Sequence, residues 1–172
     1  EENHVMQRLH AATRLRSWLL LALLLQLTGC GCANGPTEQV TIKEQTFTLE
    51  VASTLEAIKK GLGERESIPD NGGMLFVFPD AQQRRFWMVD CLVDIDIMYL
   101  DALGRITSIH TMRAEPLQTG SETRTEYEQR LKRYPSGLSA QFAIELQAGK
   151  IRELDLKTGN KIDIPIECLK AR

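Results

Sequence analysis

Two aspartates stand two positions apart in an apolar run, and their carboxylates could support acid–base chemistry. Asp94 and Asp96 alternate with Val93, Ile95 and Ile97. Residues two apart in a β-strand share a face, and their Cβ atoms lie about 7 Å apart. A glycoside hydrolase needs two carboxyl groups about 5 to 9.5 Å apart beside the bond that it cleaves. The spacing permits a carboxylate-dependent hydrolase, but exposed strand aspartates are common, and we assign no catalytic residue.

Trp87 lies close to these acids in the sequence and suggests a binding site for a polar ligand. The apolar ring hydrogens of a sugar stack on an indole, while its hydroxyl groups meet carboxylate acceptors. This hypothesis places Trp87, Asp90, Asp94 and Asp96 around one ligand. Two alternatives stay open. Trp87 and Met88 could pack in the core, and Asp96 could be a buried structural group that accepts hydrogen bonds from the backbone or the indole.

The elements that must position these residues follow the pattern of strands. Apolar residues alternate with polar ones or form short runs between turn residues. The expected strands or short buried segments are 40–42, 47–51, 74–78, 93–101, 105–112, 142–146 and 162–164. Residues 79–85 and 135–137 interrupt the pattern, and a helix is expected over 53–60 with Ser53 or Thr54 as its cap. We therefore predict a mainly β (α+β) fold, a compact β-barrel-like or β-sandwich domain with one or two short helices.

Residues 113–134 are charged, contain few large aliphatic side chains and interrupt the succession of strands. Thr123 and Glu126 have the spacing of a capping box, so a helix is expected within 121–132. A helix of alternating charge is usually a solvated surface. The excursion could also contact a protein partner, which is the second function that we consider.

The composition is that of one ordinary globular domain. The chain has 172 residues, of which 42% are hydrophobic and 26% charged, and this fits a single core rather than a disordered chain. The formal net charge of -2 offers no basic face of the kind that nucleic-acid binding requires. We expect neither a nucleic-acid partner nor a cofactor.

The first thirty residues have the three parts of an export signal. Arg8, Arg14 and Arg16 form a basic region, and an apolar run follows from residue 18. The sequence Leu27-Thr28-Gly29-Cys30 comes directly after this run. This leader resembles a bacterial lipoprotein signal, which implies cleavage before Cys30 and a lipid on that cysteine. The alternative is an uncleaved anchor, but the run is shorter than the roughly 20 residues that span a bilayer. We expect an exported protein anchored to the cell envelope, on its periplasmic or extracellular face.

Three cysteines remain if Cys30 carries lipid, and an exported compartment permits disulfides. Cys32 lies in the expected tether, so Cys91 and Cys168 are the expected pair, with two buried thiols as the alternative. No two cysteines of the domain have the C-x-x-C spacing, and His110 is the only histidine of the domain. We therefore expect no metal site.

Several short motifs follow one another in a characteristic order. They are Val51-Ala52, Gly61-Leu62, the run 73–79, Phe86-Trp87-Met88, Asp96, Gly104 and the run 144–149. This succession resembles the DUF192 family, also called UPF0127, over roughly residues 46–164. The resemblance implies a small exported or membrane-anchored β-rich domain without an established activity. In the family pattern Lys-Asn-Thr follows Phe-Trp-Met, whereas this chain has Val89-Asp90-Cys91, so a site that depends on the lysine and asparagine is not carried over.

We therefore expect a signal peptide at 1–29, a flexible tether at 30–39 and a single domain at 40–168. The function that we predict is non-catalytic binding of a carbohydrate or another envelope ligand. An accessory protein that uses residues 113–134 and a glycosidase-like hydrolase are the alternatives.

Overall fold

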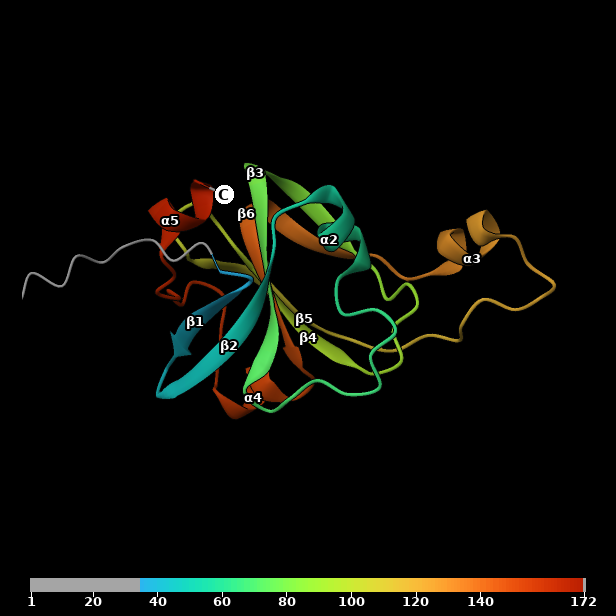
Figure 1. Ribbon diagram of the computed structural model, residues 1–172, viewed down its shortest axis with the longest axis horizontal. Helices are drawn as coiled ribbons and strands as arrows, with labels where there is room; N and C mark the ends of the chain where they lie inside the picture. Colours follow the sequence, from blue (N-terminus) through green and yellow to red (C-terminus); the bar gives the residue numbers. More distant parts are fainter. Residues whose placement is uncertain (1–34, 172) are drawn as a thin grey trace, which may run out of the picture. The chain divides into compact units, whose positions relative to one another are not determined.

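The computed structural model describes residues 35–171, which contain one six-stranded sheet (Figure 1). The strands are β1 (Thr37–Ile42), β2 (Gln45–Ala52), β3 (Gly72–Phe86), β4 (Ile95–Leu100), β5 (Ile106–Met112) and β6 (Tyr134–Gln147). Their order is β1-β2-β3-β6-β4-β5, so β1 and β5 are the edges. The expected mainly β fold is thereby confirmed.

All neighbouring strands are antiparallel except β2 and β3. A parallel pair needs a crossover connection, and here the connection contains helix α2 (Leu55–Lys60). Thr54 caps this helix, because its side-chain oxygen accepts a hydrogen bond from the backbone nitrogen of Ala57 at 3.2 Å. The cap is one of the two that the sequence predicts.

The other helices of the described part are α3 (Arg124–Arg130), α4 (Lys150–Glu153) and α5 (Ile166–Lys170). The helices of residues 35–171 are all short, and none of them has the length and apolar character needed to cross a membrane.

Each face of the sheet carries its own hydrophobic cluster, as alternation along the strands requires. The α2-side cluster contains Leu62, Met74, Phe76, Met88, Cys91, Ile97, Tyr99 and Ala143, among others, with Ile58 of α2 packed against it. The α5-side cluster contains Leu75, Met98, Ile144, Ile151, Leu156 and Leu169, among others. Side chains that neighbour each other in the sequence therefore serve opposite sides of the molecule.

Two strands are longer than the sequence pattern predicts. The expected end of a strand at Pro79 is wrong, because β3 continues to Phe86. Pro79 lies between Val77 and Gln82, where the register with β6 shifts, so its missing N–H group removes no regular ladder bond. The expected interruption at 135–137 is wrong for a similar reason, since these residues belong to β6 and lie opposite another register shift of β3.

The C-terminal end also differs from the expectation. Residues 162–164 form no strand, although the neighbouring residue Lys161 makes an isolated bridge to Arg105. Instead Ile162 and Ile164 are buried in the α5-side cluster, and the chain ends its described part in α5. Burial of alternate isoleucines thus does not require a strand partner.

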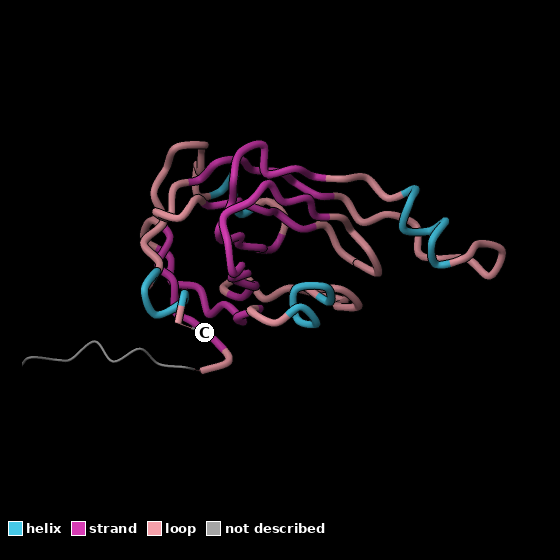
Figure 2. The backbone as a smooth tube through the Cα atoms, turned by 90° about the horizontal axis from the view of Figure 1, so that it is seen from above, coloured by secondary structure: helices cyan, strands magenta, loops and turns pink. Residues whose placement is uncertain are grey.

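Residues 113–133, which we call the arm, extend beyond the end of the sheet and carry α3 at their far part (Figures 1 and 2). The predicted capping box is present at the start of α3. The Thr123 backbone nitrogen donates to Glu126 Oε2 at 2.7 Å, and the Glu126 backbone nitrogen donates to Thr123 Oγ1 at 3.3 Å.

The expected disulfide between Cys91 and Cys168 is wrong, because Cys91 has a free thiol. Cys91 belongs to the α2-side cluster. Cys168 lies in α5, whose Leu169 packs in the cluster on the opposite face. The sheet therefore stands between the two cysteines.

Candidate functional site

A pocket of about 510 Å³ opens on the α2 side of the sheet. Its walls come from α2, the end of β3, the loop after Trp87 and the arm. The apolar lining consists of Ile58, Leu62, Phe76, Phe86, Trp87, Val89 and Cys91. Its volume is within the range of pockets that hold small ligands.

Glu145 of β6 lies in this pocket and is 4% exposed. Its neighbours across the sheet are Met74 on β3 and Ile97 on β4, both apolar. Its Oε2 atom is buried and has no hydrogen-bond partner within the described part of the chain. A buried polar atom without a partner typically costs about 1 to 3 kcal/mol, so a ligand that supplies one would gain that energy.

Gly61, at the end of α2, lies close to the carboxyl group of Glu145. A Cβ atom at this position would lie 3.7 Å from Glu145 Oε2 and 3.5 Å from the Phe76 ring. The φ angle of Gly61 is +51°, in the region that favours glycine. The glycine therefore ends the helix and lies in close contact with the carboxyl group.

Burial raises the pKa of Glu145 to about 8, although the nearby Arg65 guanidinium acts in the opposite direction. Arg65 is itself engaged by Glu50 through two hydrogen bonds of 2.5 and 2.8 Å. The carboxyl group is thus mostly protonated at pH 7 and can donate a hydrogen bond as well as accept one.

Cys91 shares the pocket and is not suited to nucleophilic chemistry. Burial, followed by the charges of Glu145 and Asp90, raises the pKa of its thiol to about 12. The thiol, not the reactive thiolate, is therefore present at neutral pH.

Trp87 forms part of the pocket wall and is 37% exposed. The guanidinium of Arg133 in the arm stacks on its ring, 3.7 Å from the centroid. Phe86 packs edge-to-face against Phe76 at a centroid distance of 4.8 Å. Met88 is fully buried, so within the Phe-Trp-Met motif only Met88 has a purely internal position.

Asp96 lies on the other face of the sheet from this pocket. Its carboxylate accepts hydrogen bonds from Thr111 Oγ1 at 2.7 Å, Gly149 N at 2.8 Å and Ile151 N at 2.9 Å. The two backbone donors belong to the start of α4, so Asp96 holds that helix against β4. This is the structural role that the sequence left open.

Asp94 lies near the surface at the start of β4. The backbone nitrogen of Ala114 donates to it at 2.8 Å, and Arg113 forms an ion pair with it. These two partners, Ala114 first, lower the pKa of Asp94. Asp96 is thus buried among three hydrogen-bond donors, whereas Asp94 contacts Arg113 and Ala114 of the arm. The structure does not bring the two carboxylates to a common pocket.

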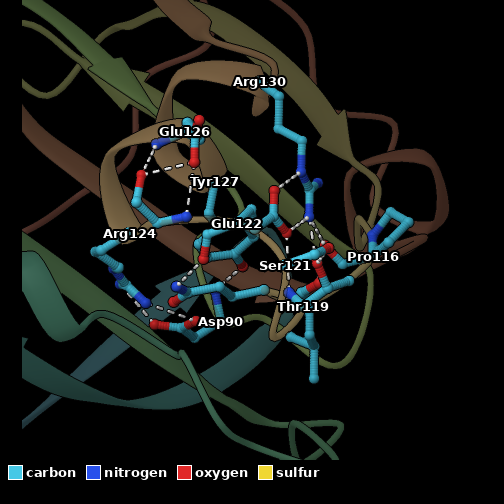
Figure 3. A network of polar contacts seen from close by, with 12 residues as sticks. Asp90, Pro116, Thr119, Ser121, Glu122, Arg124, Glu126, Tyr127 and Arg130 are labelled. Atoms are coloured by element: carbon cyan, nitrogen blue, oxygen red, sulfur yellow. Dashed lines mark hydrogen bonds and ion pairs between the residues drawn. The ribbon is translucent and has the colours of Figure 1, made fainter.

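Asp90 lies beside the pocket and connects it to the arm. It accepts hydrogen bonds from Arg124 at 2.7 and 3.1 Å, and its backbone nitrogen donates to the Tyr127 hydroxyl at 2.8 Å. Figure 3 shows this contact together with the Glu122–Arg130 pair further along the arm. Arg124 is part of the pocket lining, so the arm belongs to the site.

Of the four predicted ligand-binding residues, Trp87 lines the pocket, Asp90 supports its edge, and Asp94 and Asp96 lie elsewhere. Glu145 is not among the site residues predicted from the sequence. A signal for it exists, because it is the one charged residue in the apolar run 142–146 and part of the Ile144-Glu145-Leu146 motif. Within residues 35–171 no cluster of three or more His, Cys, Asp or Glu side chains could hold a metal ion.

These features define a small mainly β domain with a ligand-sized pocket on one face of a single mixed sheet. The family model of DUF192, described as Uncharacterized ACR, matches residues 38–164, and the chain belongs to this family. No curated protein matches the chain in sequence.

Two crystal structures show the same fold. One is a protein of unknown function from Novosphingobium aromaticivorans DSM 12444, with 24% identity and a TM-score of 0.60 over 74% of this chain and 84% of that one. The other comes from Sinorhizobium meliloti 1021 and has been provisionally described as a transcription regulator. It shares 21% identity, with a TM-score of 0.58 over 73% of this chain and 89% of that one. At these identities the likeness concerns the fold alone.

Proposed function

We propose that the domain is a non-catalytic binding protein that holds a small organic ligand, a carbohydrate or another envelope component, in the pocket of Glu145 and Trp87. The observation that carries this proposal is the unpartnered Oε2 atom of Glu145, buried at an otherwise largely apolar wall. A ligand hydroxyl or carbonyl group would complete its hydrogen bonding. The exposed part of the Trp87 indole offers a surface for a ring.

The same proposal includes anchoring to the cell envelope through lipid on Cys30. It rests on the leader sequence, which lies outside the described residues. Residues 37–39 of the expected tether belong to β1, so the chain between Cys30 and β1 would hold the domain close to the ligands of the envelope.

A fluorescence titration of the full chain tests the binding proposal. Trp18 and Trp87 are the only tryptophans, so Trp18→Phe leaves Trp87 as the sole indole reporter. Mono- and disaccharides, neutral and acidic, are titrated at pH 7. We expect at least one of them to change the Trp87 emission with saturation.

Two substitutions at Glu145 separate hydrogen bonding from shape. Glu145→Leu removes both polar atoms and should weaken binding at least tenfold, whereas Glu145→Gln keeps a donor and an acceptor and should retain most of it. Asp94→Asn is the matched control, because that carboxylate lies outside the pocket. Absence of any saturable ligand, or equal affinity in the Glu145→Leu variant, would contradict the proposal.

A further inference from the structure

Three cations at the pocket form no ion pair with a carboxylate of the described residues. Lys59 and Lys60 stand at the end of α2, and Arg85 stands on β3. All three are exposed, and no ion pair involves them within residues 35–171. Like charges gathered at one opening raise the local potential and attract anions.

The acidic groups nearby cancel only part of this charge, because a single arginine faces two carboxylates and leaves one negative charge against the three cations. Glu128, the other carboxyl group of the lining, is engaged by Arg124 at 2.8 Å. Asp90 is engaged by the same arginine at 2.7 Å. Arg133, stacked on Trp87, places a further cation beside the pocket.

Glu145 is compatible with an anion in the same pocket. Its raised pKa keeps it largely uncharged at neutral pH, so it does not repel a negative group. It can instead donate a hydrogen bond to an oxygen of the ligand.

We propose that the ligand is a soluble organic anion, whose ring or apolar body lies against Phe86 and Trp87 while its carboxylate or phosphate group contacts Lys59, Lys60 and Arg85. This inference rests on the binding function proposed above and adds the charge of the ligand. The anionic group lies at the opening, where it stays partly hydrated, and a neutral oxygen of the same ligand reaches Glu145. A ligand with an apolar body and one charged group matches a pocket that has apolar walls and positively charged side chains at its opening.

Matched pairs of ligands test this charge preference. N-acetylmuramic acid and N-acetylglucosamine differ by a carboxylate-bearing lactyl group, and glucose 6-phosphate and glucose differ by a phosphate. In the Trp18→Phe full chain at low salt, we expect at least one anion to bind tenfold or more tightly than its neutral partner. The preference should shrink as salt rises, because screening weakens contacts at a solvated rim. The two pairs also distinguish a carboxylate from a phosphate ligand.

Charge removal at the rim provides the second readout. Lys60→Gln and Arg85→Gln should each weaken binding of the preferred anion severalfold and leave the neutral partner unchanged. Lys161→Gln, at an exposed position outside this pocket, is the control. Equal binding of both members of each pair, unaffected by Arg85→Gln, would overturn the anion inference and leave the binding function standing. Absence of binding by all four compounds and by the wider saccharide panel would overturn both.

Discussion

Asp96 and Glu145 are both buried carboxylic acids of the central sheet, and their surroundings give them different roles. Asp96 has three donors within 2.9 Å, so its hydrogen bonds are completed by the protein. Glu145 has apolar neighbours on both adjacent strands and an oxygen without a hydrogen-bond partner among residues 35–171. The difference separates a group that holds the fold together from one that is available to a ligand.

The raised pKa of Glu145 predicts a pH-dependent stability. Between about pH 4.5 and 8 the unfolded chain releases the Glu145 proton while the folded protein keeps it. The free energy of unfolding should therefore fall as pH rises through this window, by up to a few kcal/mol, and level off above it. Glu145→Gln should remove this decrease of the free energy of unfolding with pH, as measured by urea unfolding at several pH values.

Glu66→Gln is the control for this experiment. Because Glu66 is exposed, its replacement should leave the pH dependence of the free energy of unfolding unchanged. A Glu145→Gln variant with the same pH dependence as the natural chain would show that Glu145 is ionised normally.

Replacement of Asp96 should destabilise the domain. Asp96→Asn keeps one oxygen for the two backbone donors and faces its amide group toward the Thr111 hydroxyl, which can also accept. It removes the charge that had strengthened these hydrogen bonds, so we expect a loss of about 2 to 4 kcal/mol. Chemical unfolding measures the loss, and Asp94→Asn, at a more exposed site, should cost about 1 kcal/mol or less. Equal losses in the two variants would contradict the role assigned to Asp96.

At the scale of elements, the arm connects the end of the sheet to the pocket. Tyr127 of α3 is fully buried, and its hydroxyl accepts a hydrogen bond from the Asp90 backbone. Further out, hydrogen bonds from Arg130 and Thr119 hold the pKa of Glu122 at about 2. The order of the arm therefore depends on polar contacts more than on an apolar core of its own.

Loss of the capping box should loosen α3. Thr123→Ala removes the side-chain acceptor at the N-cap, which costs about 1 kcal/mol. Amide hydrogen exchange should become several times faster within residues 124–130, with little change in the sheet. Thr125→Ala, inside the same helix and exposed, is the control. Equal rates of amide hydrogen exchange in the two variants would show that the capping box does not control the stability of α3.

At the scale of the whole molecule, the leader predicts attachment to a membrane. Cys30→Ala removes the sulfur that would carry the lipid, so a processed, membrane-associated protein should become an unprocessed precursor. Immunoblotting of cell fractions and mass spectrometry of the N-terminus measure this change, with Cys32→Ala as the control. Unchanged processing and fractionation of the Cys30→Ala variant would refute the lipoprotein hypothesis.

Several features follow from the sequence because their physics is local. The capping residues Thr54 and Thr123 act within one helical turn, and the alternation of the β4 residues assigns each side chain to a face. The isoleucines beside Asp96 likewise indicate that a carboxylate is buried there. The DUF192 motifs predict the family and the mainly β fold, which are confirmed.

The pocket was decided by the tertiary structure. Whether a buried carboxyl group finds partners depends on side chains that are distant in the chain, and Glu145 meets Met74, Ile97 and Gly61 only after the strands pair. The same long-range packing put Cys91 and α5 on opposite sides of the sheet. Sequence alone thus indicated which residues are buried in the sheet, while strand pairing determined that Glu145, and not Asp96, would lack a partner.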